Sequence, residues 1–212
     1  MRRFERLRSV AVPLDQVNID TDRIIPARFL TRKRESGLGT ALFHDLRFDE
    51  AGQARPEVTL NQPAYAGARI LVADDNFGCG SSRESAVWAL ADAHGAVGDG
   101  FLSIIAPSFG DIFYNNACKN GLLPVRLPAP ACASLRASLR ADPGAEVTVD
   151  LVEQRVTFPD GSEHGFEIDP YRKTCLVQGL DDIDLTLLET DRIAAYERRT
   201  AEREPWRAMV SG

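Results

Sequence analysis

Residues 71–88, LVADDNFGCGSSRESAVW, decide the fold of this 212-residue chain. The stretch opens with the apolar run Leu71–Ala73, which is typical of a buried strand. Short polar side chains then end the strand. Gly78 and Gly80 follow, and glycine permits a positive φ or a close approach of the backbone to a ligand. The residues after this turn predict a helix over Ser82–Ala93, with a serine as its cap.

The turn itself is a candidate anion site. A helix N-terminus presents unpaired N–H groups and partial positive charge. Ser81, Ser82 and Arg83 stand at that point and add further donors, so a carboxylate or phosphate would fit there. The dinucleotide pattern Gly-x-Gly-x-x-Gly is interrupted by Arg83, and no Gly-Lys-Ser/Thr of a P-loop follows. A tight connection without a ligand is the alternative interpretation.

The following segments predict an α/β fold. Phe101–Ala106 and Leu122–Val125 are apolar strands, and Phe109–Asn120 between them has helical spacing. This β-α-β-α-β order predicts a parallel central sheet with right-handed crossovers and flanking helices. Later segments predict helices and extra antiparallel strands: helices over 129–140, 170–178 and 190–203, and strands over 146–151, 155–158 and 163–168. With neither a repeat nor a linker in view, residues 1–212 are expected to form one domain.

The composition is that of a globular protein rather than a nucleic-acid or membrane protein. Hydrophobic residues make up 44% and charged residues 26% of the chain, and the net charge is −6. An acidic chain is a poor general binder of nucleic acid. The arginine-rich first ten residues lack the apolar stretch of a secretory signal, and no segment is apolar enough to span a membrane. A cytoplasmic location is therefore expected.

The four cysteines are widely spaced and form no Cys-x-x-Cys pair. A zinc or iron–sulfur site built from this chain alone is therefore not expected. Cys118, Cys132 and Cys175 are interpreted as small buried residues. Cys79 stands in the glycine turn, where a helix N-terminus would lower the pKa of its thiol. A nucleophilic role for Cys79 is disfavoured because it has no histidine beside it in the sequence.

Two charged segments precede the central stretch. The cluster Asp20–Arg23 is interpreted as a turn that caps itself through its own side chains. The segment Ala27–Gly39 carries the basic residues Arg28, Arg32, Lys33 and Arg34, followed by the glycine hinges Gly37 and Gly39. It could form a mobile lid over an anionic substrate, or it could be a solvated charged loop.

Four stretches carry a family resemblance that runs nearly from end to end. They are Asn76–Glu84 (NFGCGSSRE), Asn18–Leu30 (NIDTDRIIPARFL), Ala106–Val125 (APSFGDIFYNNACKNGLLPV) and Asp169–Leu187 (DPYRKTCLVQGLDDIDLTL). Together they resemble the swivelling domain of aconitase-type hydro-lyases, and most closely the small subunits of bacterial 3-isopropylmalate dehydratases. The implied fold is the swivelling β/β/α domain of the aconitase type.

The resemblance also implies a function and a partner. The family isomerises 2-isopropylmalate to 3-isopropylmalate, in leucine biosynthesis, by removing and re-adding water. It works as a two-chain complex in which the large subunit holds a [4Fe–4S] cluster. This chain is accordingly expected to bind no metal itself, to pair with that large subunit and to act on a small hydroxy-dicarboxylate.

By the same resemblance, particular side chains acquire roles. Ser81 matches the family's base, which acts as an alkoxide. Arg83 would stabilise that anion and grip a substrate carboxylate through two hydrogen bonds. Gly80 and Ser82 would assist in binding the substrate. The resemblance also makes the stretch Arg28–Gly39 the expected specificity loop, and its substrate-binding candidates are Arg28, Arg32 and Arg34.

One residue departs from the family pattern. A histidine usually follows the Arg-Glu of the motif, and this chain has Ser85 there. The expected base is unaffected, so catalysis is retained in this interpretation. A related hydro-lyase acting on a methylmalate, citraconate or homoaconitate type of substrate is an alternative. A non-catalytic module that only binds a carboxylate is the other.

Overall fold

The computed structural model describes residues 1–32, 34, 37–93 and 100–204. The chain divides into two compact units, Met1–Gly179 and Leu180–Gly212.

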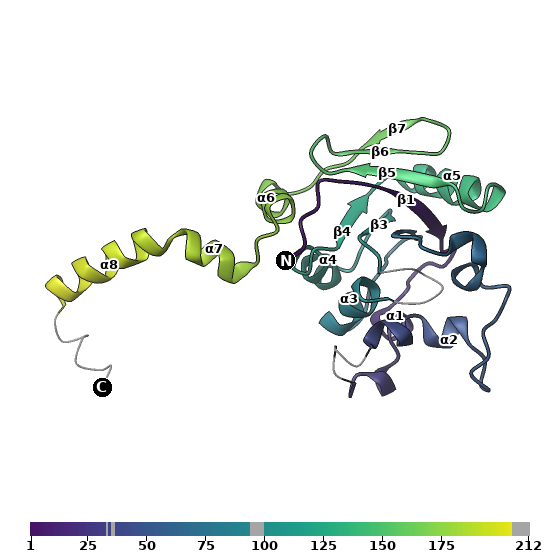
Figure 1. Cartoon of the computed structure of the whole chain (residues 1–212), viewed down its shortest axis with the longest axis horizontal. Helices are drawn as coiled ribbons and strands as arrows, with labels where there is room; N and C mark the ends of the chain where they lie inside the picture. The colour runs from purple at the N-terminus through teal and green to yellow at the C-terminus, as the bar shows by residue number, and fades with distance from the viewer. Residues whose placement is uncertain (33, 35–36, 94–99, 205–212) are drawn as a thin grey trace. The chain divides into compact units, whose positions relative to one another are not determined.

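In the first unit, seven strands of the described chain form one sheet in the order β4-β3-β2-β1-β5-β6-β7 (Figure 1). The strands are β1 (Arg6–Pro13), β2 (Ile70–Val72), β3 (Ser103–Ala106), β4 (Leu123–Arg126), β5 (Glu146–Asp150), β6 (Arg155–Thr157) and β7 (Glu163–Gly165). Strands β1 to β4 pair in parallel, whereas β5, β6 and β7 are added antiparallel at the β1 edge. The predicted α/β fold with a parallel core and extra antiparallel strands is confirmed.

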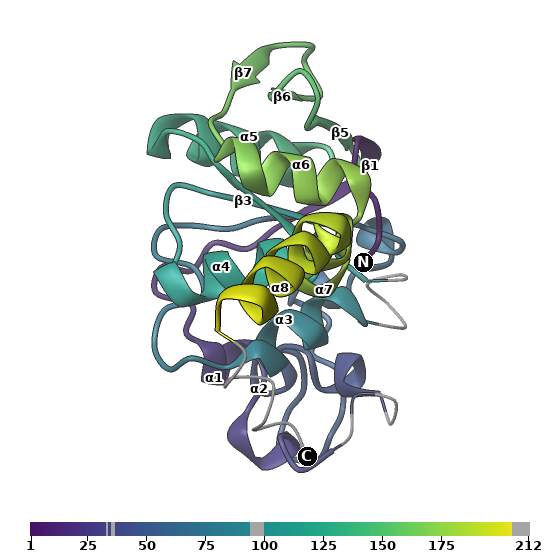
Figure 2. The same cartoon turned by 90° about the vertical axis from the view of Figure 1, so that its left-hand side faces the viewer.

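Helices cover both faces of this sheet. The α-helices of the first unit are α1 (Thr21–Ile24), α2 (His44–Arg47), α3 (Glu84–Ala91), α4 (Asp111–Lys119), α5 (Ala129–Ala141) and α6 (Pro170–Gln178). Short 3-10 turns lie in the long connection from β1 to β2, at Ala27–Phe29, Leu38–Ala41, Thr59–Asn61 and Pro63–Tyr65. Figures 1 and 2 show α3 and α4 on one side of the sheet and α5 and α6 on the other.

The alternation of side chains along the strands explains this layering. Leu71 and Ile104 point to the core shared with α3 and α4, and their neighbours Ile70 and Ile105 point to the core shared with α5 and α6. All four side chains are fully buried. Strands buried on both faces read as continuous apolar runs, which is why these segments were recognisable from the sequence.

The beginning and the end of the first unit are tied together. The ammonium group of Met1 donates to the carbonyl oxygen of Gly179 at 2.8 Å, and the backbone N–H of Phe4 donates to that of Leu176 at 2.9 Å. Gly179 ends α6 with a φ of 71°, and a Cβ there would lie 2.8 Å from the carbonyl oxygen of Met1. The last turn of α6 is therefore anchored on the first residues of the chain.

The second unit contains α7 (Asp182–Leu188) and α8 (Thr190–Arg203). Asp181 begins α7 with a capping box, because its carboxylate accepts from the N–H of Asp184 at 2.8 Å and the Asp184 carboxylate accepts from the N–H of Asp181 at 3.0 Å. The predicted helix over 190–203 is confirmed. Across the described ranges, no helix has the length and apolar character needed to cross a membrane.

Candidate functional site

The loops that follow β1, β2 and β3 meet at one edge of the sheet, because parallel strands end on the same side. The turn after β2 is held between the other two loops by backbone hydrogen bonds. Gly78 N–H donates to Ile19 O at 2.7 Å, and Thr21 N–H donates to Cys79 O at 3.0 Å. On the other side, Phe77 N–H donates to the carbonyl oxygen of Ser108 at 3.1 Å. The predicted glycine turn therefore lies at the centre of this edge.

The two glycines of the turn serve different purposes. Gly78 has a φ of +73°, and a Cβ there would lie 2.2 Å from Cγ of Phe113 on α4. Gly80 has a φ of +91°, but a Cβ there would meet nothing closer than Cβ of Asp20 at 3.5 Å. Gly78 thus allows the turn to pack directly on a core aromatic ring. At Gly80, glycine is needed only for the positive φ, which would be strained for a residue with a side chain.

The helix begins later than the sequence predicted. The expectation that Ser81 or Ser82 caps a helix starting at Ser82 is wrong, because α3 begins at Glu84 and Arg83 occupies the N-cap position. Arg83 has extended backbone angles, φ −123° and ψ 104°. The Ser81 carbonyl accepts a hydrogen bond from Oγ1 of Thr21 at 3.1 Å. Ser81 is therefore part of the glycine turn rather than of the helix.

Both serines are accessible. Gly80, Ser81 and Ser82 are exposed, and Arg83 is partly buried. A group bound by another molecule can therefore reach the Ser81 hydroxyl. The N–H groups of the first turn of α3 lack intrahelical carbonyl partners, and they follow the serines directly in the chain.

The guanidinium of Arg83 forms an ion pair with the carboxylate of Asp22 on α1. Asp20 caps α1 by accepting from the N–H of Arg23 at 2.7 Å, so the self-capping interpretation of residues 20–23 is confirmed for Asp20. The link from Asp22 to Arg83 was missed. The signal that could have revealed it is the pairing of β1 with β2, which brings the loops after both strands together.

A polar network supports the turn from its far side. Oγ of Ser108 donates to Asp75 at 2.5 Å and accepts from the N–H of Asn76 at 2.9 Å. The Asn76 amide donates to Oδ1 of Asn18 at 2.8 Å. These contacts join the loops after all three strands, and they leave little freedom for the backbone before Gly78.

Arg28, one of the predicted substrate contacts, is already paired. Its guanidinium donates to Oδ2 of Asp45 on α2 at 2.9 Å, and this contact lowers the pKa of Asp45 to about 2. Asp45 is therefore ionised throughout the neutral range, and Arg28 would have to leave it to bind a substrate carboxylate. Asp45 and Asp22 line the same hollow of about 410 Å³.

Arg34 lies at the opposite end of α3 from the serines. Its guanidinium binds the carboxylate of Asp92 through bonds of 2.6 and 3.0 Å, and Asp92 is the C-cap residue of α3. Eight helical residues at 1.5 Å each place that end about 12 Å from the N-terminal end. Arg32 stacks on the ring of Phe29, with its Cζ 4.6 Å from the ring centre. Lys33 lies outside the described residues.

Comparisons with known proteins decide the family. The model of the aconitase C-terminal domain matches residues 1–130, LeuD_N matches 133–170, and the C-terminal domain of 3-isopropylmalate dehydratase small subunits matches 182–209. A protein from Rhodospirillum centenum named 3-isopropylmalate dehydratase small subunit is 51% identical over 97% of this chain and 98% of its own. A protein named 3-isopropylmalate dehydratase small subunit 1, from Bordetella pertussis, is 49% identical over 98% of this chain and all of its own.

The chain belongs to the 3-isopropylmalate dehydratase small-subunit family. A solved structure from Methanocaldococcus jannaschii, titled 3-isopropylmalate dehydratase (leuD), has the same fold. It superposes with a TM-score of 0.61 at 23% identity, covering 91% of this chain and 99% of that one. The fold that the family resemblance predicted is therefore confirmed.

The cysteines of this family member do not form a cluster site. Cys118, Cys132 and Cys175 are buried, as predicted, and Cys79 is partly exposed. Among the residues that the structure describes, no three His, Cys, Asp or Glu side chains come together in a way that could hold a metal ion. The donor set of a [4Fe–4S] cluster therefore has no counterpart in this part of the chain.

The prediction of an acidified Cys79 thiol is wrong. Burial and the negative charge of Asp20 raise the pKa of Cys79 above its ordinary value. The physical reason is positional, since α3 begins only at Glu84 and Asp20 lies opposite Cys79 in a parallel bridge. The thiol is therefore mostly protonated at neutral pH, which fits a packing role.

Proposed function

We propose that this chain is the small subunit of a 3-isopropylmalate dehydratase, a hydro-lyase active only with its large subunit. The complex would convert 2-isopropylmalate to 3-isopropylmalate by dehydration and rehydration, in the leucine pathway. Full-length similarity near 50% to proteins of that name carries the proposal. Residues 1–212 would act together as one small-subunit domain of a cytoplasmic heterodimer.

Ser81 is the proposed base. The proton to be removed is on a carbon next to a carboxylate, so it is weakly acidic and needs a strong base. An alkoxide is strong enough, but its negative charge must be stabilised. The exposed position of Ser81, two residues before Arg83 and three before the start of α3, supports this role.

Arg83 is the proposed carboxylate clamp. A guanidinium has five N–H donors in a planar fork, and Asp22 engages one terminal nitrogen. The remaining donors can bind a substrate carboxylate while Asp22 keeps the side chain in place. Arg83 thus would hold the substrate and the Ser81 anion in one small region.

The other substrate contacts are proposed by position. Gly80 and Ser82 flank the base and would offer a backbone N–H and a hydroxyl. Arg28, Arg32 and Arg34 would belong to a loop that reads the rest of the substrate. Arg28 and Arg34 are paired with Asp45 and Asp92 in this structure, so their use would require a rearrangement of this loop.

The large subunit would hold the [4Fe–4S] cluster, a Lewis acid for the departing hydroxyl group. The family relationship supports this proposal.

Ser85 favours a second candidate substrate class within the same reaction. It occupies the first turn of α3, in the place of the family's usual histidine, and is partly buried. A smaller side chain two residues after Arg83 would alter the room for the substrate, so acids of the methylmalate, citraconate or homoaconitate type are the alternatives.

Reconstitution tests the proposal. The chain is co-expressed with a large subunit of 3-isopropylmalate dehydratase, purified without oxygen, and given a panel of hydroxy-diacids. We expect co-purification and ultraviolet absorbance of the unsaturated intermediate, with 2-isopropylmalate as the best substrate. Turnover of only another diacid would reassign the substrate. A chain that binds carboxylates but gives no alkene with any large subunit would be a binding module.

A further inference from the structure

The second unit carries an unusual concentration of exposed apolar side chains. Three of the most exposed large apolar residues lie on α7, where Ile183 is 71%, Leu187 63% and Leu188 67% exposed. Two more lie on α8, at Ile193 and Tyr196. In the described part of the first unit, exposed apolar residues of this size are scattered singly over different elements, which is ordinary for a protein surface.

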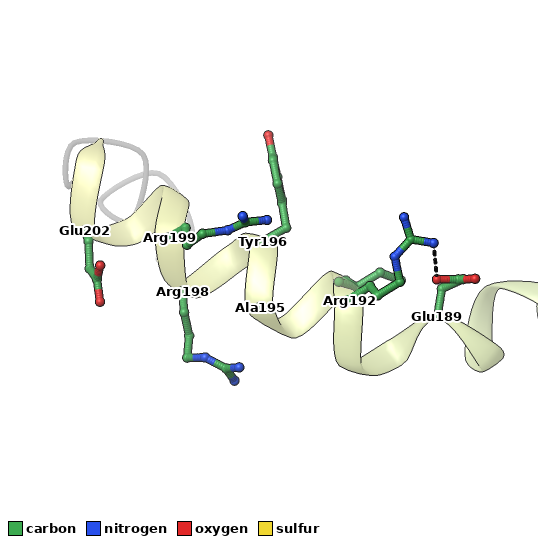
Figure 3. Close-up of a pocket in the computed structure, with 8 residues that line it drawn as sticks. Glu189, Arg192, Ala195, Tyr196, Arg198, Arg199 and Glu202 are labelled. Atoms are coloured by element: carbon green, nitrogen blue, oxygen red, sulfur yellow. Dashed lines mark hydrogen bonds and ion pairs between the residues drawn. The ribbon is translucent and has the colours of Figure 1, made fainter.

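Figure 3 shows why this surface is not a small-molecule pocket. All the side chains that border the hollow drawn there come from one stretch, Glu189–Glu202, so the hollow is the open side of a single helix. Tyr196 projects away from the helix axis, and Arg192 forms an ion pair with Glu189 at 2.7 Å. Exposed apolar side chains next to charged ones are the pattern of a protein interface with a polar rim.

The two helices cannot be stabilised by a core of their own. None of the described side chains of α8 is buried, although the helix has 14 residues. Isolated helices of about this length are marginal in water, and their stability in proteins comes from packing an amphipathic face. The capping box of α7 sets where the helix begins, but it does not cover Leu187 or Leu188.

We propose that α7 and α8 form the docking segment by which this chain binds its large subunit. This inference rests on the function proposed above. The apolar strip of Ile183, Leu187, Leu188, Ile193 and Tyr196 would pack against an apolar groove of that subunit.

The choice of partner follows from how the family models divide the chain. The model matching residues 1–130 is a C-terminal domain of aconitase, which by its name is part of a longer chain. Here the same domain occurs in a chain whose relatives are named small subunits. The peptide link to the rest of an aconitase chain is therefore missing, and a non-covalent interface with the large subunit must take its place. Beyond residue 130, residues 133–170 match LeuD_N and residues 182–209 match the C-terminal domain of 3-isopropylmalate dehydratase small subunits. Of these two added segments, the second is the one that carries the cluster of exposed apolar side chains on α7 and α8.

The test measures binding of the full-length chain to the purified large subunit. We compare the wild type with the double variant Leu187→Glu/Leu188→Glu, and use Val152→Glu, 49% exposed in the first unit, as the matched control. Two buried charges at an interface centre should weaken affinity by about 30-fold or more. The control should bind like the wild type, and turnover of the double variant should recover when the small subunit is in large excess.

Other outcomes would overturn the inference. Unchanged affinity in the double variant would remove α7–α8 from the interface. A wild-type homodimer that the double variant dissolves, with large-subunit binding intact, would assign the strip to a second copy. A loss of thermal stability in the isolated double variant without a loss of affinity would assign it to the chain's own packing. If the wild type itself bound no large subunit, the proposed function would fail as well.

Discussion

The most quantitative consequence of the site geometry concerns Gly78. Replacing it with alanine places a Cβ 2.2 Å from Cγ and 2.6 Å from both Cδ atoms of the Phe113 ring, which is 3% exposed. The neighbouring Gly80 is the matched control, since its φ is also positive but its Cβ would have ordinary contacts. The pair separates packing from backbone conformation within one turn.

The expected energies differ accordingly. A left-handed conformation costs an L-residue about 1–2 kcal/mol, which applies to both variants. Overpacking adds about 1–3 kcal/mol for Gly78→Ala, so its unfolding free energy should fall by about 2–5 kcal/mol in all. Gly80→Ala should lose only the first part. Phe113 cannot retreat easily, because it also contacts Phe77 at 5.3 Å and Phe109 at 6.3 Å between ring centres.

Urea unfolding followed by circular dichroism measures both variants. The unfolding free energies of the two variants should depend on urea concentration with the same slope. The midpoint of Gly78→Ala should lie at a lower urea concentration than that of Gly80→Ala. Equal stability of the two variants would refute the reasoning, because it would mean that the turn does not press on α4. A crystal structure of Gly78→Ala in which neither the turn nor the Phe113 ring has moved would refute it as well.

Three further predictions concern the side chains of the turn and its neighbours. Arg83→Lys should lower kcat/KM of the reconstituted enzyme by about 100-fold or more, because an ammonium cannot form the two-bonded fork; retained activity would contradict the clamp. Asp22→Asn should change stability by less than about 1 kcal/mol, because the side chains of the pair are 52% and 24% exposed. The same variant should still reduce kcat/KM, and full activity would show that Arg83 needs no orienting partner. Asp20→Asn keeps an oxygen for the α1 cap but removes the charge that raises the pKa of Cys79, so alkylation of Cys79 at pH 8 should become faster. Mass spectrometry after iodoacetamide measures this, with buried Cys118, whose pKa is raised to about 11, as the unreactive reference.

The fold was predictable because its signals are local and repeated. The apolar strands around Leu71 and Ile104 and the glycine-ended helices have the period and punctuation expected of a parallel α/β core. Even the helix 170–178 begins and ends where proline and glycine predict it. Some boundaries moved: the strand predicted over 163–168 ends at Gly165, and α3 begins two residues later than predicted. At α3, a hydrogen bond from Oγ1 of Thr21 to the carbonyl oxygen of Ser81 holds one of the serines that were expected to cap the helix.

The candidate residues could be selected from the sequence, whereas the pairings that the structure shows for them could not. Ser81 and Arg83 stand out because two serines and an arginine follow a glycine turn. The ion pair between Asp22 and Arg83 joins two residues that are 61 positions apart in the chain. No local sequence pattern predicts such a pair. The same holds for the ion pair of Arg34 with Asp92, which takes a predicted substrate contact to the far end of α3.

The most direct test of the account is the turnover of Ser81→Ala in the reconstituted complex, measured beside Ser82→Ala and with the affinity for the large subunit determined for both. Loss of a general base typically lowers the rate by about 100- to 10,000-fold, and we expect that loss for Ser81→Ala with assembly intact. Ser82→Ala should lose far less. Activity of Ser81→Ala close to that of the wild type, in a complex that assembles normally, would contradict the assignment of Ser81 as the base.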